Sequence, residues 1–88
     1  MKPYNQTITG NKILREFAHD IDSHELVWHR DKKDRIVRVI EGNGWKFQFD
    51  NMLPMVLYEG QEIFISKEKF HRVIKGNDNL KIEIIEKD

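Results

Sequence analysis

From Glu25 to its C-terminal end, the chain alternates short apolar runs with turn-forming residues. The runs recur at roughly ten-residue spacing and are rich in Val, Ile and aromatic residues, which favour strands. Residues 45–50 are the clearest case, because aromatic and polar side chains alternate and therefore point to opposite faces of a strand. The pattern predicts an all-β fold, a small sandwich or barrel of about six or seven short strands.

The N-terminal segment has a less regular pattern. Residues 1–11 are polar and predict a loose arm with one short extended piece. Residues 12–20 space their apolar side chains as a helix would, with Asn11 as a cap, but the same residues also fit a bent edge strand. Both alternatives stay open at this point. We predict a single domain in which residues 1–22 form the arm and residues 23–88 form the barrel.

Composition narrows the range of partners. The fifteen basic and fifteen acidic residues cancel, so the basic patch expected of a protein that binds nucleic acid or an anionic membrane is missing. No run approaches the ~20 apolar residues of a membrane span. The polar N-terminal residues also lack the apolar core of a signal peptide. We therefore expect a cytoplasmic protein with neither a nucleic-acid nor a membrane partner.

The short chain has limited means of stabilising itself. A domain of this size hides only roughly 60–65% of the surface of its unfolded chain. The sequence contains no cysteine, so neither a disulfide nor a thiolate metal site can add stability. Strand edges left exposed on a small barrel favour pairing with a second copy. We therefore expect a homodimer.

Two histidines and an aspartate are the candidate site residues. His29 and Asp31 lie two positions apart in residues 25–31, which the pattern predicts as a strand, so their side chains point to the same face. His71 lies in a later predicted strand, residues 70–74. In a small barrel these three side chains can converge on one pocket.

The order and spacing of these residues resemble the two sequence motifs of the cupin family, whose members are small jelly-roll barrels. The second motif, G-x5-P-x-G-x2-H-x3-N, aligns from Gly60 and places His71 on the family's histidine. The departures from this motif are Ser66 for the proline, Glu68 for the glycine and Lys75 for the asparagine.

The first cupin motif, G-x5-H-x-H-x(3–4)-E-x6-G, aligns on His29 and ends at Gly42. Asp31 stands at the second histidine, Arg35 at the glutamate, and Ser23 at the opening glycine. The run Trp-His-Arg-Asp with the later Gly-Trp-x-Phe-Gln-Phe-Asp also resembles very small cupin-like proteins of phages and marine microbes, a group without a settled activity. The resemblance covers most of the domain and implies a cupin-like jelly-roll barrel.

Two histidines and a carboxylate with open coordination positions form the facial triad of non-haem Fe(II) oxygenases. Double-stranded β-helix oxygenases, which are related to cupins, use the same H-x-D…H order. His29, Asp31 and His71 therefore form a candidate site for one divalent ion, Fe, Mn, Ni or Zn. The sequence does not select among these metals.

Arg35 supports the opposite interpretation. A guanidinium cannot ligate a metal and stays positively charged, so it would repel a divalent ion. Arg35 is expected to pair with Asp31, four residues earlier, across a turn. Such a pair could occupy the barrel mouth without any metal, and both the metal site and a metal-free pocket stay open.

Three functions follow from these alternatives. The first is the binding of a small-molecule ligand in a pocket built from His29, Asp31, Arg35, Gln48 and His71. The second is a metal-dependent enzyme, an oxygenase or an isomerase, with the two histidines and Asp31 as ligands. The third is an oligomeric structural or accessory protein whose barrel carries no active site. A fold alone does not decide among them, because one barrel hosts many unrelated chemistries.

Overall fold

The computed structural model describes residues 3–87. Among these residues no helix is long and apolar enough to cross a membrane. The strands are β1 (Asn5–Thr9), β2 (Lys12–Phe17), β3 (Asp34–Glu41), β4 (Lys46–Phe49), β5 (Met55–Val56), β6 (Glu62–Ile65), β7 (His71–Ile74) and β8 (Leu80–Lys87), with one short 3-10 helix, η1 (Ser23–Glu25). The prediction of an all-β fold is confirmed.

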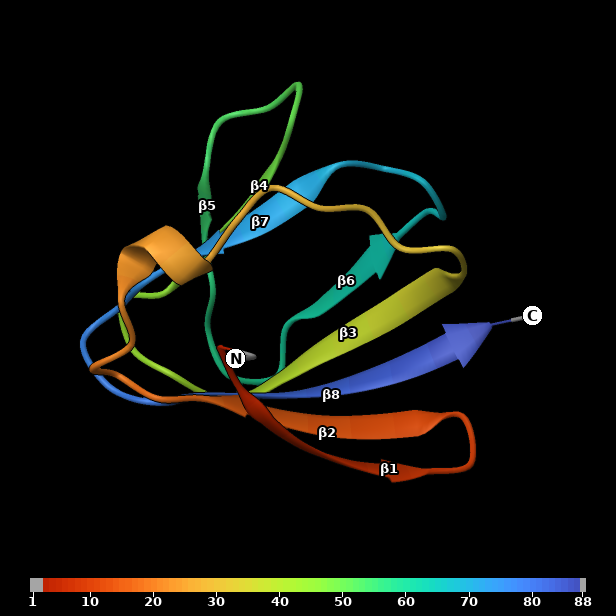
Figure 1. Cartoon of the computed structure of the whole chain (residues 1–88), viewed down its shortest axis with the longest axis horizontal. Coiled ribbons are helices and arrows are strands. Elements are labelled where there is room, and N and C mark those ends of the chain that lie inside the picture. The colour runs from red at the N-terminus through yellow and green to blue at the C-terminus, as the bar shows by residue number, and fades with distance from the viewer. Residues whose placement is uncertain (1–2, 88) are drawn as a thin grey trace.

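The strands form two antiparallel sheets. One has five strands in the order β1-β2-β8-β3-β6, and the other has three in the order β5-β4-β7. Figure 1 shows the smaller sheet above the larger one, with the chain between η1 and β3 running along β7. The last strand lies between β2 and β3, so segments far apart in the sequence hold the larger sheet together.

The core lies between the two sheets. β8 shows how the sequence produces it, because Leu80, Ile82 and Ile84 are buried while the residues between them are only partly so. This period of two is the one that a strand with one covered face requires. The buried apolar residues are Ile13, Phe17, Ile21, Leu26, Val37, Val39, Trp45, Phe47, Leu57, Ile63, Ile65, Leu80, Ile82 and Ile84.

β2 decides between the two alternatives for the N-terminal segment. It is a strand, so the helical alternative is wrong, but it pairs with β1 on one side and β8 on the other, so it is not the edge strand that was the second alternative. Ile13, Arg15 and Phe17 are buried on its inner face, whereas Leu14 is exposed on the outer face. The helical spacing of the apolar residues was misleading because Leu14 does not belong to the core. β1 pairs with β2, so both strands belong to the five-stranded sheet.

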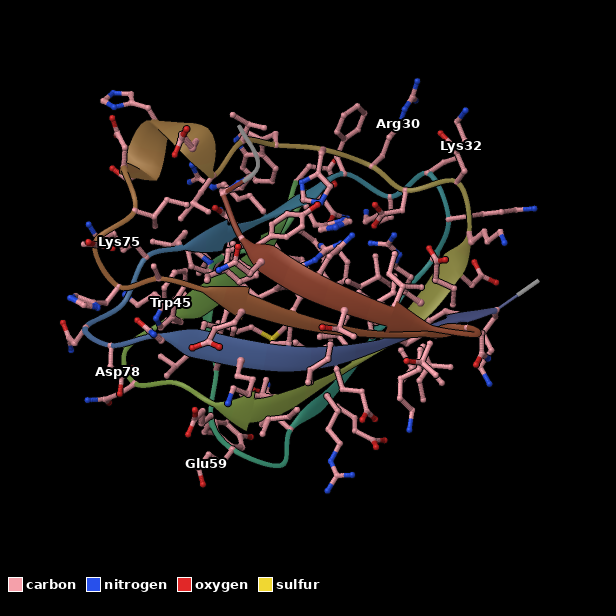
Figure 2. The ribbon with its side chains drawn as sticks, turned by 60° about the horizontal axis from the view of Figure 1, so that its bottom comes forward. Arg30, Lys32, Trp45, Glu59, Lys75 and Asp78 are labelled. Carbon is pink, nitrogen blue, oxygen red and sulfur yellow. The ribbon has the colours of Figure 1, made fainter. Side chains whose placement is uncertain are left out.

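Trp45 closes one end of the barrel. Its side chain is fully buried, and its indole Nε1 donates a hydrogen bond of 2.5 Å to the carbonyl of Asp78. Figure 2 shows Trp45 and Asp78 at the same end of the molecule, with Lys75 nearby. The ring also packs against Phe17, at 5.7 Å between ring centroids. The loops before β4 and before β8 are therefore fixed to the same core residue.

Gly76 permits this close approach, and Gly76→Ala is expected to destabilise the protein by about 2–3 kcal/mol. A Cβ at Gly76 would overlap the backbone nitrogen of Trp45 and the carbonyl oxygen of Asn43, and neither atom can rotate away. Urea unfolding followed by circular dichroism measures the loss. Gly60→Ala is the control, because its Cβ would meet nothing within 4 Å and only the left-handed φ of 84° is strained. Equal losses in the two variants would contradict the explanation.

Candidate metal centre

His29 reaches the site from an irregular segment rather than from a strand. The prediction of a strand over residues 25–31 is wrong, because η1 ends at Glu25 and the following residues form only an isolated bridge between His29 and His71. The backbone N–H of His29 donates to the carbonyl of His71 at 3.0 Å, and the N–H of His71 donates to the carbonyl of His29 at 2.9 Å. Figure 2 shows Arg30 and Lys32 of this segment projecting away from the barrel. Pairing with β7, rather than a long strand, therefore positions His29.

The structure brings His29, Asp31 and His71 together. Each offers one ligand atom, and these atoms lie within 4.8 Å of one another. Nε2 of His71 is 3.3 Å from Oδ2 of Asp31, a spacing typical of two ligands of one ion, since ligand atoms ~2.1 Å from a metal lie roughly 3.0–3.4 Å apart. His71 is buried, while His29 is partly exposed. The three side chains are thus gathered closely enough to form a candidate metal site.

Backbone carbonyls determine which nitrogen of each histidine is available. Nδ1 of His71 lies 2.8 Å from the carbonyl of Lys69, and Nδ1 of His29 lies 3.1 Å from the carbonyl of Val27. A carbonyl only accepts, so each neutral ring carries its proton on Nδ1 and keeps a lone pair on Nε2. Metal-ligating histidines are usually oriented by such a bond from the other ring nitrogen. Both imidazoles are therefore prepared to bind an ion through Nε2.

Oδ2 of Asp31 lacks the partner that a buried oxygen needs. It is buried and accepts no hydrogen bond, although Nε2 of His71 is its near neighbour. With the proton of His71 on Nδ1, a lone pair and a carboxylate oxygen face each other, and this arrangement requires a cation or an additional proton. The donor set of two imidazoles and one carboxylate is the facial triad. These residues fit a divalent transition metal.

Arg35 occupies only one oxygen of Asp31. As expected from the sequence, the two side chains pair, at 3.2 Å between Nη1 and Oδ1. Nε and Nη2 of Arg35 also donate to Oε2 of Glu86, at 3.1 and 2.8 Å. Glu86 thus offsets the charge of Arg35, and Oδ2 of Asp31 stays directed at His71. Pairing with Arg35 and metal binding are therefore compatible.

The electrostatics favour the deprotonated forms of two ligands. Burial raises the pKa of Asp31, but the His71 ring in its protonated, donating form and the charge of the Arg35 guanidinium outweigh this effect, so its pKa lies below the ordinary value. Burial lowers the pKa of His29, and the hydrogen bond to Val27 only partly opposes the shift. At neutral pH, Asp31 therefore carries its charge and His29 is neutral, as metal ligands must be.

A cavity of about 270 Å³ adjoins the cluster. The charged and imidazole side chains in its lining are Arg15, Glu25, His29, Asp31, Arg35 and His71. Much of the remaining wall consists of branched aliphatic and aromatic side chains from both sheets. Four of the five pocket residues expected from the sequence thus line it.

Gln48 is placed elsewhere. It does not belong to the cavity lining, and its amide donates to the carbonyl of Met52 and accepts from Arg72. Arg15 is a lining residue that the sequence did not single out. The alternation of buried and exposed side chains along β2 places Arg15 on the inner face. The sequence did not reveal this alternation, because residues 12–20 also fit a helix.

Comparisons with known proteins identify the fold. No family profile and no curated protein matches the chain. Solved structures do match, and 88% of this chain superposes on a DMSP lyase with a TM-score of 0.75 and 17% identity. Fe(II) HppE matches 96% of the chain, with a TM-score of 0.71 and 14% identity. A putative mannose-6-phosphate isomerase from Ralstonia eutropha JMP134 matches 97%, with a TM-score of 0.67 and 15% identity.

The matched proteins differ from this chain in length. The chain spans 37% of the length of the DMSP lyase chain and 48% of the HppE chain, but 82% of the isomerase-like chain. At such low identity the likeness concerns the fold alone. The chain has an all-β, cupin-like jelly-roll fold, as the two sequence motifs indicated.

Proposed function

We propose that the protein is a small metal-dependent enzyme that holds one divalent transition metal with His29, Asp31 and His71 and acts on a small molecule in the adjoining cavity. The observation that carries this proposal is the buried Oδ2 of Asp31, which has no hydrogen-bond partner and faces Nε2 of His71. Three protein ligands leave coordination positions for a substrate. Fe, Mn, Ni and Zn all remain candidates.

The solved structures support the metal. HppE has been determined with Fe(II) and with Co(II) on the same type of barrel. When bound, such an ion acts as a Lewis acid that polarises substrate oxygens, and a redox-active ion also supports oxidation. The residues of this chain would hold the ion, keep Asp31 charged beside Arg35, and exclude water with the aliphatic wall of the cavity.

The cavity also bears on the other two functions. A barrel without any active site would be expected to fill its interior with side chains, whereas here an open cavity has charged and imidazole groups in a largely apolar wall. This supports small-molecule binding over a purely structural role. A metal-free binding pocket is the second candidate, and the observation that favours it is the close pairing of Arg35 with Asp31.

Metal titration tests the proposal. Protein purified without a histidine tag and freed of metal is titrated with Zn(II), Mn(II), Ni(II) or, without oxygen, Fe(II), by calorimetry. We expect one ion per chain and a rise in melting temperature, since a ligand at 100 times its Kd stabilises by about 2.7 kcal/mol. Asp31→Asn should weaken binding at least tenfold, because the amide carries no charge.

His24→Ala is the matched control, because His24 is exposed and lies outside the cluster. It should bind the metal as the wild type does. Failure of the wild type to bind any of the four ions would exclude the enzyme proposal and leave the metal-free pocket. Equal weakening by Asp31→Asn and His24→Ala would show binding at a different site.

A further inference from the structure

Arg15 is a buried cation whose partners in the structure are uncharged. It lies on the inner face of β2 and is 8% exposed. Its Nε and Nη2 donate to Oε1 of Gln6, at 3.0 and 2.9 Å, and its guanidinium lies 3.8 Å from the centre of the Tyr4 ring. Within residues 3–87 no carboxylate lies at ion-pair distance from Arg15, and Nη1 has no hydrogen-bond partner there.

This environment differs from that of the second arginine in the cavity. Arg35 contacts two carboxylates, Asp31 and Glu86, whereas Arg15 contacts an amide and an aromatic ring. Burying a charge without a counter-charge is costly, and buried arginines are normally paired. Burial accordingly lowers the pKa of Arg15 below its ordinary value. A charge held in this way beside open space is typical of a site for an anionic ligand.

The charges around the cavity lead to the same conclusion. The two arginines and the two carboxylates of Asp31 and Glu86 cancel one another. A divalent ion at the proposed site would leave two positive charges in excess, or one if the exposed carboxylate of Glu25 is counted as well. An anion with a carboxylate head offsets part of that excess and can use both the Arg15 guanidinium and an open position on the metal. Glu25 also lines the cavity, but it is exposed and makes no ion pair with Arg15.

The rest of the cavity restricts the body of the ligand. Its volume of about 270 Å³ lies just below the range of about 300–1,000 Å³ that is usual for small-molecule pockets. Val37, Ile63 and Ile65 belong to its aliphatic wall. This wall favours a short apolar body over a sugar or a nucleotide.

We propose that the cavity binds a small organic acid with a short apolar body, and that Arg15 is the residue that anchors its carboxylate. The role of the metal in this complex rests on the proposed function, but the anchoring by Arg15 does not. Arg15 acts here as a binding residue and not as a metal ligand.

The test compares two probes of equal shape, 3-methylbutanoate and the uncharged 3-methylbutanamide. Their affinities are measured by chemical-shift titration of ¹⁵N-labelled protein, in the metal-free and in the Zn(II)-treated form. We expect the wild type to bind the carboxylate at least tenfold more tightly than the amide. Arg15→Gln should remove that preference and leave amide binding unchanged. Arg38→Gln is the matched control, because Arg38 is exposed on β3, and it should keep the preference.

The outcomes separate the two proposals. If the carboxylate preference depends on Arg15 in the metal-free form while no metal binds, the anchor stands and the metal-dependent function is excluded. If the wild type does not distinguish the two probes, or if Arg15→Gln keeps the preference, the anchor is excluded whatever the metal does. If Arg15→Gln does not fold, Arg15→Lys retains the charge without the two bonds to Gln6, and it should keep a carboxylate preference reduced a few-fold.

Discussion

His71→Ala is expected to weaken metal binding at least 100-fold and to destabilise the metal-free protein by about 2–3 kcal/mol. The first effect follows because loss of a ligand should exceed the 10–100-fold cost of changing a residue that only supports a ligand. The second follows from packing, because His71 is buried and stacks on Phe47, with ring centroids 5.4 Å apart. Calorimetric metal titration and urea unfolding in the presence of a chelator measure the two effects separately.

His71→Phe separates ligation from packing. A phenyl ring keeps the stack on Phe47 but provides no nitrogen, so metal binding should be lost as in His71→Ala while most of the stability is retained. The hydrogen bond to the carbonyl of Lys69 is lost in both variants, so it does not affect the comparison. Metal affinity of His71→Phe close to that of the wild type would contradict the assignment of His71 as a ligand.

Arg35→Glu is expected to increase metal affinity at least tenfold and to destabilise the metal-free protein by about 3–5 kcal/mol. The wild-type guanidinium pairs with Asp31 and Glu86. A carboxylate at this position would instead place three negative charges together, which is unfavourable without a cation. A divalent ion would relieve the repulsion and gain a ligand at the position where the cupin motif has glutamate. Thermal unfolding with and without Zn(II) should therefore show a larger metal-induced shift than in the wild type.

Arg35→Gln is the intermediate case. It removes the positive charge without adding a negative one, so its metal affinity should lie between those of the wild type and Arg35→Glu. The rise in melting temperature caused by the metal should follow the same order, smallest in the wild type, larger in Arg35→Gln and largest in Arg35→Glu. An Arg35→Glu variant that binds metal no more tightly than the wild type would show that Arg35 does not limit affinity at this site.

The sequence predicted that the three site residues come together, but it did not predict the irregular segment that holds His29. His29, Asp31 and His71 converge as their motif positions indicated. The strand predicted over residues 25–31 is absent because a single bridge to β7 holds His29, and no local pattern reveals such a distant pairing. Tertiary contacts of this kind commonly override local propensity.

The remaining differences also have tertiary causes. The contact of Arg35 with Asp31 followed from their short separation in sequence, but its second partner, Glu86, comes from β8, fifty-one positions away. Arg15 was hidden because residues 12–20 fit two periodicities equally well. Gln48 lies on β4 as expected, but its amide turns to Met52 and Arg72 rather than to the cavity.

The bridge between His29 and His71 has a consequence for a protein that lacks cysteine. An ion bound at this bridge would act as a crosslink between the irregular segment and β7, closing a loop of about 40 residues. A covalent crosslink across a loop of that length restricts the unfolded chain enough to stabilise the folded one by about 4 kcal/mol. The metal would then do for this small barrel what a disulfide does for secreted domains of similar size, and the strength of the fold would vary with the supply of the ion.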